Sequence, residues 1–104
     1  MPVSLDQRES DCRIRLEGQI TIASAAELKN LLVNWAATGK DLALDLTRAE
    51  EIDISTLQLL WSAGREAART GRRVACAASA AAISAAQSAG FPEFPGLTDE
   101  RHAA

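Results

Sequence analysis

Three segments of the chain alternate between apolar and polar residues, as a β-strand with one buried face does. In the first of them, Cys12, Ile14 and Leu16 share one face and charged side chains share the other. In the second, leucine occupies every second position. The strands predicted in this way are residues 12–18, 41–46 and 73–78, and a less regular segment at residues 3–8 is a candidate edge strand.

The segments between the strands carry apolar residues at the spacing of a buried helix face. Ser24, with Glu27 three residues later, matches a capping box and predicts the start of the first helix, which Gly39 ends. A polar turn at residues 48–51 is expected before the second helix. Each helix should therefore bury one face against the strands.

The second and third helices have similar end signals. Gly71 is expected to end the second helix, and Ser79 and Gly90 bracket an alanine-rich third helix. Alanine has the highest helix propensity, and tight packing explains its abundance there. The side chains expected in the core of the domain are Leu28, Leu31, Leu32, Trp35, Leu42, Leu44, Leu46, Leu57, Leu60, Trp61 and Val74.

Strands and helices thus alternate along the chain with short connections, which is typical of an α/β fold. We expect a four- to five-stranded, mostly parallel sheet with right-handed crossover helices, in which the first strand is the candidate to run against the others. A chain of 104 residues suits one core. We therefore expect a single domain over residues 1–104, with a polar tail at residues 98–104.

The charge pattern argues against nucleic acid and membranes as partners. The formal net charge is −3, so no overall positive field attracts a phosphate backbone. No apolar run approaches the roughly 20 residues of a transmembrane helix, and no signal-peptide pattern is present. We expect a cytoplasmic protein that does not insert into a membrane. A solvated helix face is the simplest interpretation of the basic group Arg65, Arg69, Arg72 and Arg73.

Residues for catalysis are not grouped in the sequence. Cys12 and Cys76 fall at apolar strand positions, which favours buried reduced thiols over a disulfide or a metal site. The one histidine, His102, lies in the polar tail and has no nucleophile to activate. Phosphate-binding glycine loops are absent. We therefore expect no enzyme, no cofactor and no metal, and we interpret the carboxylates at strand ends as capping or solubilising groups, namely Asp41, Asp45 and Asp53.

The sequence Asp53-Ile54-Ser55-Thr56-Leu57 places hydroxyl groups at a predicted helix start. In one interpretation Asp53, Ser55 or Thr56 caps the helix and stabilises it by about 1 kcal/mol. In the other, Ser55 is an exposed hydroxyl that a partner kinase phosphorylates. The spacing alone favours the cap.

Several segments together resemble the STAS domain, the family of the anti-sigma factor antagonists and their relatives. The runs that carry the resemblance are residues 42–46, 52–60 and 72–76. Residues 16–20 and 89–91 are similar to the blocks that flank these runs in the family. Because the order and spacing of all five agree, the resemblance spans nearly the whole chain and implies the STAS fold.

The resemblance also implies a site. The family's loop typically reads Asp-Ser-Ser-Gly-Leu, and its second serine is the phosphorylation site in anti-sigma factor antagonists. The matching residues imply a partner-binding site at Asp53, Ile54, Ser55 and Thr56, with Ser55 as the phosphorylated residue. Ile54 and Thr56 depart from the family's serine and glycine. Thr21, also assigned to the partner-binding site, stands where many phosphorylatable members have an aspartate.

Two kinds of protein partner follow from the resemblance. The first is an anti-sigma factor of the serine-kinase class, whose binding ends when Ser55 is phosphorylated. The second is a larger assembly, either a phospholipid-transport ABC system or a chemotaxis-type signalling complex, in which the domain is an adaptor that is never phosphorylated. The sequence leaves both open.

Overall fold

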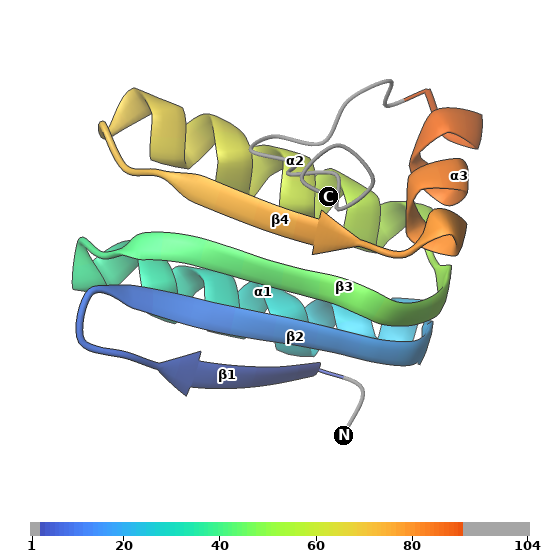
Figure 1. Ribbon diagram of the computed structural model, residues 1–104, viewed down its shortest axis with the longest axis horizontal. Coiled ribbons are helices and arrows are strands. Elements are labelled where there is room, and N and C mark those ends of the chain that lie inside the picture. The colour runs from blue at the N-terminus through green and yellow to red at the C-terminus, as the bar shows by residue number, and fades with distance from the viewer. Residues whose placement is uncertain (1–2, 91–104) are drawn as a thin grey trace.

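The computed structural model describes residues 3–90, and strands and helices alternate along them (Figure 1). The predicted polar tail and His102 lie outside the described residues. The elements are β1 (Val3–Gln7), β2 (Asp11–Ile20), α1 (Ile22–Thr38), β3 (Asp41–Ile52), α2 (Ile54–Arg69), β4 (Val74–Ala78) and α3 (Ala80–Ser88).

The strands form one four-stranded sheet in the order β1-β2-β3-β4. β1 runs antiparallel to β2, and β2, β3 and β4 run parallel to one another. Helices α1 and α2 contact each other and lie behind the sheet in Figure 1, whereas α3 packs mainly against β3 at the end of β4. This mixed sheet with crossover helices confirms the predicted fold class.

The alternating residues of the strands place one apolar face of the sheet against the helices. Ile14 of β2 pairs with Leu44 of β3, which pairs with Cys76 of β4, and all three are buried. Leu28 and Trp35 of α1 are buried in the same core. Packing in this core thus fixes where α1 and α2 begin, at the carboxyl ends of β2 and β3.

Strand β3 is longer than the sequence predicted, because the expected polar turn at residues 48–51 is instead part of the strand. Pairing of β2 with β3 continues to Ile52 across two irregularities in the register. Ala49 is buried in this stretch, and its carbonyl oxygen accepts a hydrogen bond of 2.8 Å from the Ser79 hydroxyl. The single inward residue among exposed ones explains why the pattern looked like a turn.

The first helix starts earlier than the capping box predicted. Helix α1 begins at Ile22 with Thr21 as its N-cap, and the amide of Ser24 donates to the Thr21 carbonyl oxygen at 3.0 Å. Ser24 is buried within the first turn, so its hydroxyl does not cap the helix. The end was predicted correctly, since Gly39 adopts a left-handed conformation with a φ of 72°.

Most of the expected core is buried. Three expected core residues, Leu31, Trp61 and Val74, are only half-buried. Leu31 and Val74 still pack against the buried core. Among the described residues no helix is long and apolar enough to cross a membrane.

Candidate functional site

The sheet brings the two helix starts together at the carboxyl ends of its parallel strands. Ile20 and Ile52 are the last paired residues of β2 and β3, so Thr21 and Asp53 follow at neighbouring positions. The Asp53 amide donates a 2.8 Å hydrogen bond to the Ile20 carbonyl oxygen, which joins the two loops. This end of an open α/β sheet is where such folds commonly place their binding sites.

Asp53 is the residue that caps α2. Its backbone is extended, and its carboxylate accepts a 2.8 Å hydrogen bond from the amide of Ser55. The Leu57 amide donates to the Asp53 carbonyl oxygen at 3.2 Å. Of the three candidate caps in the sequence, neither Ser55 nor Thr56 is therefore used.

Ser55 lies at the second position of α2 and is half-buried, not fully exposed as the sequence suggested. Its side chain lines a groove between α1 and α2, opposite Ala25 and Ala26. Within residues 3–90 the Ser55 hydroxyl makes no hydrogen bond, so no structural contact occupies it. The hydroxyl is thus available for chemistry or for binding.

The other residues of the predicted site differ in accessibility. Thr21 and Ile54 are exposed, whereas Thr56 is fully buried and its hydroxyl oxygen has no hydrogen-bond partner among the described residues. A partner therefore cannot touch the Thr56 side chain in this conformation. Thr56 instead fills space in the interior beneath the helix start.

Sequence reasoning missed one residue at this end of the sheet. Ile22 is 71% exposed and Ile54 is 51% exposed, and each occupies the first position of its helix. Large apolar side chains at neighbouring helix starts, rimmed by polar groups, are typical of a protein-binding surface. We call Thr21, Ile22, Asp53, Ile54 and Ser55 the helix-start surface. The exposure of Ile22 depends on where α1 begins, which the capping box misplaced.

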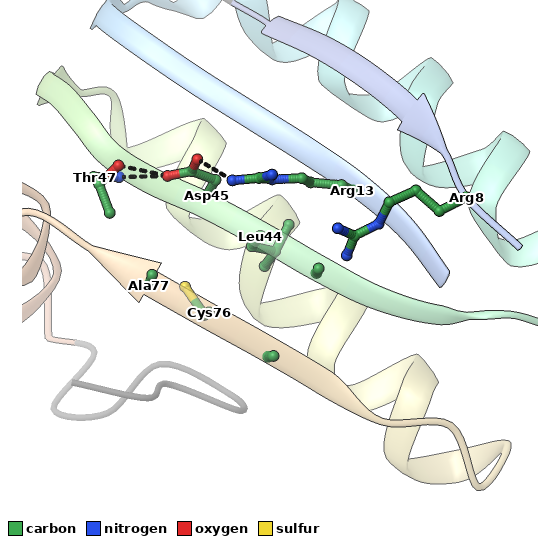
Figure 2. A pocket seen from close by; sticks show the side chains of 9 residues that line it. Arg8, Arg13, Leu44, Asp45, Thr47, Cys76 and Ala77 are labelled. Carbon is green, nitrogen blue, oxygen red and sulfur yellow. Dashed lines mark hydrogen bonds and ion pairs between the residues drawn. The ribbon is translucent and has the colours of Figure 1, made fainter. Parts of the chain in front are cut away.

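Another hollow lies elsewhere, on the outer face of the sheet (Figure 2). Asp45 there accepts hydrogen bonds from the Thr47 hydroxyl at 2.6 Å and from Arg13 at 2.9 Å, and Arg15 lies 3.4 Å away. Partial burial would raise the pKa of the Asp45 carboxyl, but the bonds from Thr47 and Arg13 outweigh it and lower that pKa. A carboxylate held ionised by cations is not poised to exchange protons.

The remaining chemical candidates also have structural roles. An Asp41 carboxylate oxygen accepts from the Arg73 amide at 2.9 Å. The Arg72 guanidinium stacks 4.3 Å from the centre of the Trp35 ring. Both cysteines are buried and unpaired, and burial raises the pKa of the Cys76 thiol to about 12. In the part of the chain that the structure describes, no cluster of side chains could hold a metal ion.

Comparison with known proteins agrees with this architecture. A family model described as "Mlab, STAS domain" matches residues 3–92. No curated protein matches the chain.

Three solved structures share the fold. The anti-sigma factor antagonist SpoIIAA in its unphosphorylated form is 17% identical, with a TM-score of 0.74 over 97% of this chain and 93% of that chain. The phosphorylated form of SpoIIAA, a Bacillus cell fate determinant, is 19% identical with a TM-score of 0.74, over 97% and 95% of the two chains. A putative anti-sigma factor antagonist from Thermotoga maritima is 13% identical with a TM-score of 0.67, over 97% and 90%.

Proposed function

The chain belongs to the STAS domain family, and on this premise we propose that it is a non-catalytic regulatory domain that acts like an anti-sigma factor antagonist in the cytoplasm. Its partner is a protein, and the helix-start surface is the site of contact. The observation that carries the proposal is the pair of exposed isoleucines, Ile22 and Ile54, beside the unbonded hydroxyl of Ser55. Covering these exposed apolar side chains with a protein surface removes them from water and so favours binding.

Phosphorylation of Ser55 is the proposed switch. The Ser55 oxygen attacks the γ-phosphorus of a nucleoside triphosphate held by a partner kinase, the bond to the β-phosphate oxygen breaks, and the nucleoside diphosphate leaves. The hydroxyl proton passes to a base of the kinase. The product carries about −1.5 to −2 charges next to the Asp53 carboxylate, so a close apolar interface is penalised by repulsion and desolvation.

A second function, that of a permanent adaptor, is favoured by one observation. Ser55 is half-buried and lines the groove between α1 and α2, which makes its hydroxyl less accessible to a kinase than a hydroxyl on an open loop. In that case the same surface binds a subunit of a phospholipid-transport ABC system or of a chemotaxis-type assembly without any switch.

The experiment compares Ser55→Ala and Ser55→Asp in a pull-down with the product of a neighbouring gene, together with intact-mass analysis after incubation with the candidate kinase. If Ser55 is a switch, Ser55→Ala binds like the wild type, Ser55→Asp binds more weakly, and the wild type gains one phosphate. Ser84→Asp adds the same charge at an exposed position of α3 and should bind normally. Both Ser55 variants should keep their melting temperature, because Asp53 and not Ser55 caps the helix.

Two outcomes decide between the functions. Equal binding by both Ser55 variants, with no mass change, would exclude the switch and support the adaptor. Equal binding by a variant with both isoleucines of the helix-start surface changed to serine would show that the partner docks elsewhere.

A further inference from the structure

An elongated groove runs between α1 and α2, starting at Ser55. The end nearest the helix starts has a volume of about 300 Å³, and the adjoining part has about 210 Å³. Lys29, Leu59 and Ser62 line both parts, so they form one continuous groove. Lys29 is the only cation that lines either part within the described residues.

The spacing of side chains along the two helices directs Lys29 toward Ser55. Ala25 is one turn before Lys29 on the same face of α1, and Ala25 and Ala26 are too small to fill the space opposite Ser55. Side chains on an α-helix lean toward its N-terminus, and Lys29 lines the same end of the groove as Ser55, so its long side chain can reach over these alanines toward the helix starts. A flexible ammonium group and a free hydroxyl therefore share one end of the groove.

Neither group is occupied in the structure. Within residues 3–90 Lys29 takes part in no ion pair, whereas the chain's other lysine, Lys40, donates to the Arg8 carbonyl oxygen at 2.8 Å. The carboxylate of Asp53 accepts a hydrogen bond from the Ser55 amide. A phosphate on Ser55 would be repelled by Asp53 and attracted by Lys29.

We propose that Lys29 is the residue that binds the phosphate of modified Ser55 and draws it into the groove between α1 and α2. The inference rests on the proposed phosphorylation of Ser55. The Lys29 ammonium offsets one of the roughly 1.5 to 2 negative charges that the phosphate adds beside the Asp53 carboxylate. Phosphorylation thus acts by adding net negative charge to the groove, which Glu66 also lines, as well as by adding bulk to the helix-start surface.

The test uses full-length protein with phosphoserine incorporated at position 55 during translation, so that no kinase is needed. The second pKa of the phosphate is measured by a ³¹P NMR titration in the wild type and in Lys29→Met. A nearby cation favours the doubly ionised phosphate, so Lys29→Met should raise that pKa by roughly half a pH unit or more. Lys29→Arg should keep the wild-type value, and Lys40→Met, which also removes one lysine charge, serves as the control.

The outcomes separate this inference from the proposed function. Equal phosphate pKa values in the wild type and Lys29→Met would overturn the inference, and so would equal increases in Lys29→Met and Lys40→Met, which would reveal only a long-range charge effect. Failure of the candidate kinase to modify Ser55 would instead contradict the proposed switch. That failure is detected separately, as an unchanged intact mass of the wild-type protein after incubation with the kinase. A raised pKa in Lys29→Met alone supports the phosphate contact.

Discussion

Replacement of Asp53 by alanine tests whether the cap and the switch reside on different side chains. The substitution removes the carboxylate that accepts from the Ser55 amide at 2.8 Å. It leaves the backbone hydrogen bonds from Asp53 to Ile20 and from Leu57 to Asp53 intact, because these need no side chain. The loss is therefore confined to one capping bond.

The expected cost follows from that single bond. Loss of a capping aspartate lowers the free energy of unfolding by about 1 kcal/mol, with a range of about 0.5 to 2 kcal/mol. With a urea m-value of about 1 to 2 kcal/mol per M, a loss of 1 kcal/mol lowers the unfolding midpoint by about 0.5 to 1 M. Ser55→Ala should leave the midpoint unchanged, since its hydroxyl makes no hydrogen bond within residues 3–90.

The assay is equilibrium urea unfolding followed by tryptophan fluorescence, which reports on the buried Trp35 and the half-buried Trp61. Asp53→Asn is the matched control, because asparagine caps a helix about as well as aspartate but carries no charge. Its midpoint should stay close to that of the wild type. An Asp53→Ala midpoint equal to the wild type, with an unchanged m-value, would refute the assignment of Asp53 as the cap.

Two further predictions concern the core. Leu44→Ala should lower the free energy of unfolding by about 2 to 5 kcal/mol, because Leu44 is buried between strands and helices, whereas Val33→Ala at an exposed position should change it by less than about 0.5 kcal/mol. Both values come from urea unfolding, and an unchanged midpoint for Leu44→Ala would contradict the packing of β3. The pKa of the Cys76 thiol is about 12 in the folded protein against an ordinary value of 9.0, so the unfolded chain loses this proton first and the stability should fall as the pH rises above 9. Urea midpoints at pH 7 and pH 10 measure the fall, which should be smaller in Cys76→Ala; an equal fall in both would show that another group causes it.

The strands and the core could be predicted because each depends on a short, regular pattern. Alternation in β2 and β4 assigned Cys12 and Cys76 to the buried face, and both are buried. The extension of β3 could not be predicted, because Ala49 is the only buried residue between Leu46 and Ile52. A strand that faces solvent on most positions has no alternation to detect, and it is held by backbone pairing with β2.

The start of α1 was misplaced for a related reason. The capping box at Ser24 is a local signal, but β2 ends at Ile20 because its pairing with β3 ends there, and the helix begins directly after it. Tertiary pairing therefore overrode the local preference. The same error hid Ile22, which becomes a candidate binding residue only when it is known to be at a helix start.

The candidate site shows the same division between local and long-range information. Asp53 and Ser55 could be identified from one stretch of sequence, because a cap and its helix are neighbours in the chain. Lys29 could not, because its relation to Ser55 depends on how α1 packs beside α2. The packing also explains why the Ser55 hydroxyl has no structural role: Asp53 caps the helix, Thr56 fills space in the core, and small alanines line the groove opposite the serine. If Ser55 were itself the cap, phosphorylation would disturb the helix start, and binding could not change without a change in stability.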